Sequence, residues 1–321
     1  MRARAAMALL PLVLCIAPSA SAQDYPRRPV RLVVTSAAGS GIDIAARLLG
    51  QHLAETWGQA VVVDNRVGAS GQIGGAMVAR ANPDGYTLLV VSPVFVIGEA
   101  LYPKLPYSFR TDFAPVARIG KTPYLMAVSP SVPAKSTADF VSYAKSRPGQ
   151  IHYASNGTGT IMHLAGEIFK TAAGVDLAHV AYKASTQAMT DVIAGRIEMM
   201  FNSVTLLAPG VRAGKLHALA IASAKRSALL PEVRTFAESG YSTIRVESWY
   251  GLVAPAKTPQ AVLATLQRDV LAAAGSQAVR DRLIAMGTEP LSESAEQFAA
   301  VISDEIDRYA RVIKSAGVTV D

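Results

Sequence analysis

The stretch VRLVVTSAAGSGIDIAARLL, residues 30–49, passes from a β-branched apolar run through a Gly- and Ser-rich loop into an amphipathic helical pattern. A second stretch, IHYASNGTGTIMHLAGEIF at residues 151–169, repeats that order. Glycines let a backbone approach a ligand closely, and the N-terminus of the following helix presents unpaired N–H groups with a partial positive charge. The two stretches predict two cradles for one small anion, although ordinary turns use the same residues.

Apolar β-branched runs alternate with helical patterns along most of the chain. The runs lie at residues 30–34, 61–63, 87–91, 125–128, 151–154, 180–182 and 216–222. Between the first two, the apolar positions of residues 42–53 share one helical face, which predicts a right-handed βαβ unit. From residue 259 the pattern is nearly all helix, and a capping box at Ser294 and Gln297 begins a last helix that Gly317 ends. The sequence therefore predicts an α/β fold.

Two extended segments are expected to connect two lobes. No repeat or low-complexity linker marks a boundary, so the chain segments near 120–128 and 245–253 are the candidates for strands that cross between lobes. Such a pair forms a hinge, with a ligand cleft between the lobes. We expect a signal peptide over residues 1–22, a first lobe over 23–124 that is completed by 249–321, and a second lobe over 125–248.

The N-terminus reads as an export signal. Arg2 and Arg4 precede an apolar run to Pro18, and Ala20-Ser21-Ala22 forms a small-x-small cleavage motif. The apolar run is shorter than the ~18 residues of a spanning helix, and no later run reaches that length, which predicts a soluble mature protein. The single cysteine, Cys15, lies within this leader. The mature chain therefore depends on its core and not on disulfides.

Charge argues against nucleic acid as a partner. The chain has 31 basic and 24 acidic residues, and removal of the leader takes away two arginines, which leaves a formal net charge of +5. The basic residues are scattered, and no basic block with interleaved aromatics occurs. This distribution indicates solubility and a mild attraction for anions.

Motifs of the common enzyme classes are absent from the sequence. It has no Gly-x-Ser-x-Gly elbow, no His-Glu-x-x-His, no Cys-x-x-Cys and no P-loop lysine, and the first loop lacks the third glycine of a dinucleotide fingerprint. The histidines are far apart, without a carboxylate cluster, so we expect no metal and no cofactor. The competing enzyme hypothesis is a secreted hydrolase that uses Ser155 or Thr160 with His163.

Three further groups of residues leave alternatives open. Asp43 opens the helix after the first loop, where it either caps backbone N–H groups or faces the cleft and receives a donor from the ligand. Ser185, Thr186 and Gln187 form a third strand–loop–helix junction, at which Ser185 is expected to be the N-cap, although a cap residue can still offer its neighbours' N–H groups to a ligand. Trp249 and Tyr250 either pack in the hinge or form a wall of the cleft.

An ordered set of motifs resembles the Bug family of solute receptors, the TctC-like binding component of tripartite tricarboxylate transporters. The resemblance covers nearly the whole mature sequence. The motifs are Tyr25-Pro26, Pro29-Val30-Arg31, Asp64-Asn65-Arg66, Pro83-Asp84-Gly85-Tyr86-Thr87-Leu88, Leu105-Pro106-Tyr107, Asp112-Phe113-Ala114-Pro115-Val116, Tyr153-Ala154-Ser155, His163-Leu164-Ala165-Gly166-Glu167, His179, Tyr182-Lys183, Ala213-Gly214-Lys215-Leu216 and Trp249-Tyr250-Gly251.

The resemblance implies a two-lobed, type II periplasmic binding fold, a Venus flytrap with two crossover hinge strands. It implies a monomeric periplasmic protein that is not an enzyme, closes on a small carboxylate partly through ordered waters, and delivers it to transporter membrane subunits. A sensor subunit for a two-component system is the alternative role. The ligand-binding positions implied by the match are Ser36, Ala37, Gly39, Ser40, Asp43, Ser155, Gly157, Thr158, Gly159, Thr160, His163, Ser185, Thr186 and Asn202.

Departures from the family pattern concern the predicted site. The usual first loop reads Pro-Phe-Ala-Pro-Gly-Gly-Gly-Thr-Asp, whereas residues 35–43 carry Ser36, Ala38, Ser40 and Ile42 at changed positions. Asn202 stands where the family often has Asp. The missing acid at residue 202 favours a more anionic ligand or an amide contact.

Overall fold

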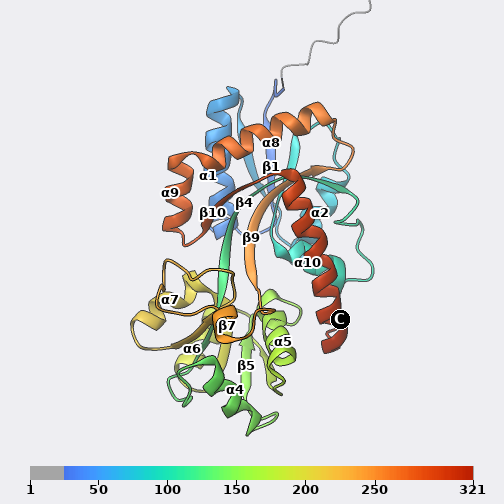
Figure 1. The fold of residues 1–321 in the computed structure, drawn as a ribbon. Coiled ribbons are helices and arrows are strands. Elements are labelled where there is room, and N and C mark those ends of the chain that lie inside the picture. Colours follow the sequence, from blue (N-terminus) through green and yellow to red (C-terminus); the bar gives the residue numbers. More distant parts are fainter. Residues whose placement is uncertain (1–24, 321) are drawn as a thin grey trace, which may run out of the picture.

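The computed structural model describes residues 25–320, so the predicted leader and its cleavage site lie outside the described residues. Two lobes lie one above the other and are joined by the long strands β4 (Phe113–Val128) and β9 (Glu247–Pro255) (Figure 1). Within residues 25–320, no helix combines the length and the apolar character needed to span a bilayer.

Lobe 1 contains a mixed sheet. Strands β2 (Val61–Asn65) and β3 (Thr87–Val91) both run parallel to β1 (Val30–Val34), while β9 runs antiparallel to β3 and β4 antiparallel to β9. The edge strand β10 (Glu289–Glu293) pairs with β4. The parallel β1–β2 pair is joined by α1 (Gly41–Trp57), as the βαβ pattern predicted.

Lobe 2 contains the second half of the sheet. Strands β7 (Met199–Ser203) and β8 (His217–Ile221) pair antiparallel with β4, and β5 (His152–Ser155) pairs parallel with β6 (Ala178–Ala181) and β7. The partner of β4 changes within one residue, because Pro123 pairs with Glu247 of β9 and Tyr124 pairs with Ser203 of β7. One continuous strand therefore supports both lobes.

Helices cover both faces of the sheet. In lobe 1 they are α1, α2 (Gln72–Ala79), α3 (Pro93–Leu101), α8 (Gln260–Gly275), α9 (Gln277–Ala285) and α10 (Ala295–Ala316), with the short 3-10 turn η1 (Ala69–Gly71). In lobe 2 they are α4 (Thr137–Lys145), α5 (Ile161–Ala173), α6 (Ser185–Ile193) and α7 (Val204–Arg212), with η2 (Ala237–Ser239).

The prediction that the chain is nearly all helix from residue 259 is correct except at one strand. Helix α10 begins with the predicted capping box of Ser294 and Gln297 and ends at Gly317 in the left-handed conformation. Between α9 and α10, however, the chain returns to the sheet as β10. This strand is short, polar and half-exposed, so it carries no apolar run by which the sequence could have indicated it.

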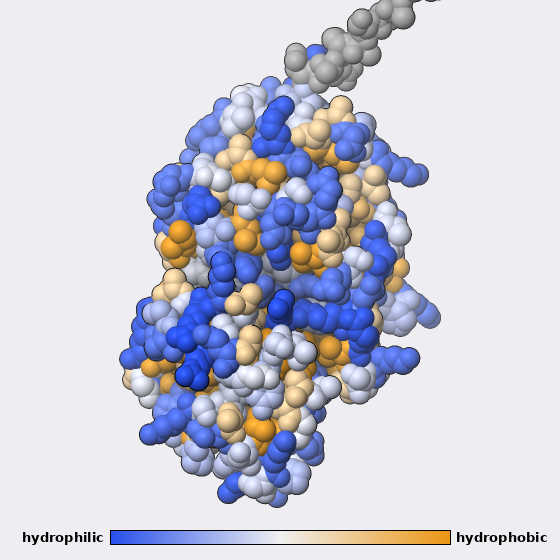
Figure 2. All heavy atoms as spheres, in the orientation of Figure 1, coloured by the Kyte–Doolittle hydropathy of each residue, from blue (hydrophilic) through white to orange (hydrophobic). Residues whose placement is uncertain are grey.

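Separate cores stabilise the two lobes. Lobe 2 packs four phenylalanines, Phe140, Phe169, Phe201 and Phe236, into one buried cluster. Lobe 1 has one cluster on each face of its sheet, and the cluster under α3 and α10 also includes Leu164 from α5 of lobe 2. Helix α5 of lobe 2 therefore packs against lobe 1. On the face drawn in Figure 2, hydrophilic side chains gather along the waist between the lobes.

Candidate ligand-binding cleft

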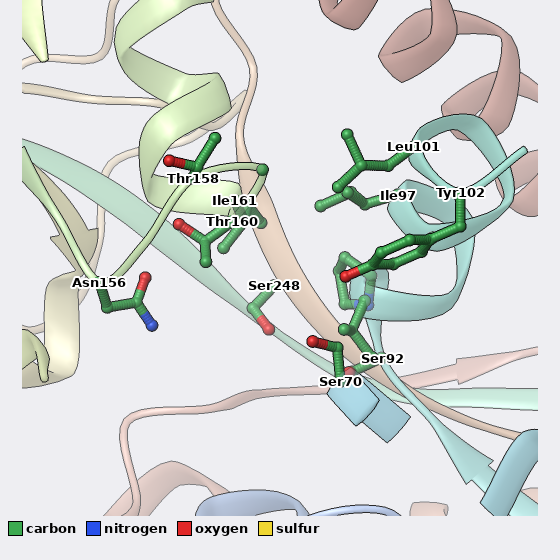
Figure 3. A pocket seen from close by; sticks show the side chains of 14 residues that line it. Ser70, Ser92, Ile97, Leu101, Tyr102, Asn156, Thr158, Thr160, Ile161 and Ser248 are labelled. Carbon is green, nitrogen blue, oxygen red and sulfur yellow. The ribbon is translucent and has the colours of Figure 1, made fainter. Parts of the chain in front are cut away.

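A cavity of about 230 Å³ lies between the lobes. Lobe 1 contributes η1 and α3, lobe 2 contributes the loop between β5 and α5, and β9 contributes Ser248 (Figure 3). None of the side chains that line it is ionisable except the hydroxyl of Tyr102. The lining residues are Ser70, Ser92, Pro93, Val94, Ile97, Gly98, Leu101, Tyr102, Asn156, Thr158, Gly159, Thr160, Ile161 and Ser248.

Two helix N-termini, one from each lobe, meet at this cavity. Ser92 is the N-cap of α3 and Thr160 is the N-cap of α5, and both residues line the cavity. The Ser92 side chain makes no capping hydrogen bond, whereas the Thr160 hydroxyl accepts from the backbone of His163. Because the first turns of a helix carry unpaired N–H groups and a partial positive charge, the cavity is suited to an anion without any cationic side chain.

The β5–α5 loop is held in shape by the protein itself. The Gly157 N–H donates to Ser155 Oγ at 3.0 Å, and the Thr160 hydroxyl donates to the Gly157 carbonyl at 2.7 Å. The Gly159 N–H donates to His163 Nδ1 at 3.0 Å. Gly157 and Gly159 have φ values of 130° and 74°, which L side chains rarely adopt. Of the predicted residues in this loop, Thr158, Gly159 and Thr160 line the cavity, while Ser155, Gly157 and His163 lie behind it.

A stacked pair of histidines supports this loop. The rings of His163 and His179 lie 3.9 Å apart with an interplanar angle of 15°, and Ser155 Oγ lies 2.7 Å from His179 Nε2. Burial, together with the neighbouring His163, lowers the pKa of His179 to about 4, and burial also lowers the pKa of His163. Both rings are therefore neutral at pH 7.

This geometry does not form a hydrolytic dyad. Ser155 is fully buried, at 0% exposure, so its hydroxyl cannot reach a substrate. The Thr160 hydroxyl donates to a backbone carbonyl and His163 Nδ1 accepts from a backbone N–H, so neither group activates the other. A nucleophile and its base need a mutual hydrogen bond and an accessible oxygen. Within residues 25–320, no group of three His, Cys, Asp or Glu residues is placed to hold a metal ion.

The first loop is closed by Asp43. This carboxylate is 1% exposed and accepts from the Gly39 N–H at 2.8 Å, from Arg47 at 3.0 Å and from Asn65 at 2.9 Å. Burial alone would raise its pKa, but these donors together lower it. The position therefore follows the capping alternative, with both oxygens engaged by the protein. None of the predicted first-loop residues lines the cavity; they are Ser36, Ala37, Gly39, Ser40 and Asp43.

The third junction also lies outside the cavity lining. Helix α6 begins at Ser185 with Ala184 as its N-cap, so the expectation that Ser185 caps the helix is wrong. Ser185 Oγ and Asn202 Nδ2 each lie 3.5 Å from the sulfur of Met162. The Thr186 carbonyl accepts from Thr190. Ser185 and Asn202 therefore lie beside the first turn of α5, and neither they nor Thr186 line the cavity.

The two hinge aromatics have different roles. Trp249 is fully buried, packs edge-on against Phe298 and donates from Nε1 to Glu305 at 2.8 Å, so it packs within lobe 1 at the hinge. The Tyr250 hydroxyl lies beside Gly41, where a Cβ would meet it at 2.8 Å. Tyr250 thus contacts the start of α1, next to the first loop.

Sequence reasoning missed the lobe 1 side of the cavity. The strand-like run at 87–91 is followed by Ser92 and Pro93, an N-cap and a proline at the first helical position, which together are a recognised helix start. That signal could have identified α3. Ser70 and Ser248 carry no such signal, because their positions depend on the backbone of η1 and on the hinge crossing.

The chain is similar to a known receptor family in sequence and to several solved proteins in structure. The family model of the tripartite tricarboxylate transporter family receptor, TctC, matches residues 45–318. The periplasmic binding protein BugD has a TM-score of 0.74 at 33% identity, with 92% of this chain and 99% of BugD covered. An R. palustris protein solved with adipate has a TM-score of 0.78 at 35% identity, with 92% of this chain and 99% of that protein covered. MatC from Rhodopseudomonas palustris, with bound malate, has a TM-score of 0.74 at 31% identity, with 90% of this chain and 100% of MatC covered. These superpositions confirm the predicted fold class.

Proposed function

Because the chain belongs to the tripartite tricarboxylate transporter receptor family, a family of solute-binding proteins and not of enzymes, we propose that it captures a small organic carboxylate between its lobes. The relatives solved with adipate and with malate support a carboxylate as the ligand class. The observation that carries the proposal is the convergence of the N-termini of α3 and α5 on one cavity.

The two helix ends explain how an anion is held without a counter-charge. Backbone N–H groups at a helix N-terminus and neutral hydroxyls form charge-assisted hydrogen bonds, each of which contributes roughly 1.5 to 3 kcal/mol net of the water hydrogen bonds that it replaces. In our proposal the ligand lies against Thr158 and Thr160 of lobe 2 and Ser92 of lobe 1. For the predicted residues that do not line the cavity, in the first loop, in the second loop and around Met162, we propose a supporting role.

Lobe movement follows from the two crossing strands. We assign residues 23–124 and 249–321 to lobe 1 and residues 125–248 to lobe 2, a division supported by the change of partner in β4 after Pro123. Rotation about β4 and β9 would open and close the cavity, since each lobe carries one of its two helix N-termini.

Export and delivery complete the proposal. The leader over residues 1–22 would direct the chain to the periplasm, where it would act as a monomer and pass its ligand to membrane subunits of a transporter. The family assignment supports such a receptor role. An N-terminus at Gln23 in protein purified from the periplasm, read by mass spectrometry, tests the cleavage after Ala22.

Thermal shift and calorimetry test the ligand class. A ligand that binds only the folded state raises the melting temperature by mass action. We expect mono- or dicarboxylates to raise it and the corresponding neutral amides not to do so. Equal shifts with acids and amides, or no shift with any acid, would contradict a site built around a carboxylate.

A further inference from the structure

One side of the cavity is apolar. Val94, Ile97 and Leu101 lie on successive turns of α3 and line the cavity together, and Ile161 of α5 adds a fourth apolar side chain. Ile97 and Leu101 are 4% and 9% exposed, so most of each side chain packs against protein, and both line the cavity. In Figure 3 both side chains point toward the cavity from α3.

The polar groups lie on the other sides. Ser70, Ser92 and Ser248 lie together where η1, the start of α3 and β9 meet, and Asn156, Thr158 and Thr160 lie on the β5–α5 loop (Figure 3). The Tyr102 hydroxyl also points into the cavity from the end of α3. The cavity thus has polar groups from both lobes and an apolar wall beside them.

We propose that the α3 wall of Val94, Ile97 and Leu101 selects acids whose carbon chain is an unsubstituted hydrocarbon and rejects hydroxylated acids. This inference rests on the proposed function and specifies the ligand class of that same cavity. A ligand hydroxyl turned to this wall would lose water without gaining a protein partner. A methylene segment at the same place instead buries apolar surface on both sides.

The size of the cavity restricts the ligand further. Its volume of about 230 Å³ is smaller than the roughly 300–1,000 Å³ of pockets for drug-sized ligands. The class is therefore a short aliphatic mono- or dicarboxylate. Added hydroxyl groups would increase ligand volume as well as polarity, so the test needs one ligand pair that differs by a single hydroxyl.

Two matched ligand pairs test the selection by calorimetry on the full mature chain. Succinate and malate differ by one hydroxyl group. Adipate and galactarate share a six-carbon chain and differ by four hydroxyl groups. We expect the unsubstituted acid of each pair to bind roughly tenfold or more tightly. Tighter binding of malate and galactarate overturns the selection while leaving carboxylate capture intact. Binding of none of these four dicarboxylates, and of neither butyrate nor 3-hydroxybutyrate as a monocarboxylate pair, contradicts both.

Variants of the wall test its role directly. Val94→Thr and Ile97→Thr each place a hydroxyl on the wall, and we expect each to reduce the preference for succinate over malate several-fold. Val96→Thr is the matched control, because Val96 is buried on the same helix without lining the cavity. An unchanged preference in both wall variants, with melting temperatures equal to that of the control variant, overturns the proposal. If Ile97→Thr fails to fold, Val94→Thr still tests the preference for succinate over malate, because Val94 is only half-buried.

Discussion

Gly159 of the β5–α5 loop lies against Leu101 at the end of α3, so closely that a Cβ at residue 159 would lie 2.4 Å from Leu101 Cδ2. The two residues belong to different lobes and both line the cavity. Val320, near the C-terminus, would lie 3.5 Å from the same Cβ through its Cγ1. The missing side chain at residue 159 therefore sets how closely the lobes approach.

A side chain at residue 159 is expected to weaken ligand binding. The sequence alone predicts that Gly159→Val occupies the space of the ligand carboxylate, but in the structure the added carbon meets Leu101 first. Gly159→Ala is already sufficient, because it combines this clash with a φ of 74° that disfavours L residues. We expect calorimetry to give an affinity for the carboxylate at least about tenfold lower.

Gly174→Ala is the matched control for that variant. Gly174 ends α5 with a φ of 61°, and nothing lies within 4 Å of a Cβ built there. It shares the backbone strain without the contact between lobes, so we expect a loss of about 1 kcal/mol in unfolding free energy and unchanged affinity. Equal affinities for wild type, Gly159→Ala and Gly174→Ala would show that Leu101 and residue 159 do not control closure.

The stacked histidines predict a fall in stability at mildly acidic pH. The folded-state pKa of His179 is about 4, below its ordinary value of 6.5, so the unfolded chain binds the proton more readily. Stability is fully present above pH 6.5 and is lost as the pH falls toward 4. Because the ring is only about half-buried, we expect on the order of 1 kcal/mol from it. Chemical denaturation between pH 7 and pH 4.5 measures the change.

Substitution separates this contribution from that of the carboxylates. His179→Gln keeps a hydrogen-bonding group near Ser155 but cannot be protonated, so its stability is expected to vary less between pH 7 and pH 4.5. Parallel profiles for the wild type and His179→Gln would mean that His179 is not the titrating group.

Both strand–loop–helix units could be predicted from the sequence, because each depends on local residues. The β-branched runs at 30–34 and 151–154 form β1 and β5, and each is followed by its loop and a helix. Local order does not determine which loops meet across a hinge. In the structure the second loop faces the start of α3, and the first loop closes on its own Asp43.

The contribution of η1 to the cavity could not be predicted either, and the reason is different. Two consecutive residues that are not glycine, Ala69 and Ser70, have φ values of 45° and 53° there. Neither residue type favours the left-handed region, so the tertiary structure must impose it. A sequence rule based on turn propensity would place glycine at these positions, as it does at Gly68 and Gly71.

Asp43→Asn is expected to destabilise the fold without a matching loss of affinity. The amide keeps the shape of the side chain, but it loses the ion pair with Arg47 and replaces an acceptor with a donor in a buried position. We expect the unfolding free energy to fall by about 1 to 3 kcal/mol. An affinity loss larger than the stability loss explains, measured by calorimetry below the melting temperature, would instead place Asp43 in contact with the ligand.

Ser70→Gly is expected to weaken binding while leaving the fold as stable or more stable. Ser70 holds a left-handed backbone that costs an L residue about 1 to 2 kcal/mol, and its hydroxyl lies in the cavity. Glycine relieves the strain and removes the hydroxyl, so the unfolding free energy should stay constant or rise by up to about 1 kcal/mol while affinity falls several-fold. Ala69→Gly relieves the same strain at a residue outside the cavity lining and should not change affinity. If Ser70→Gly binds the carboxylate as tightly as Ala69→Gly does, the strained turn serves the fold alone.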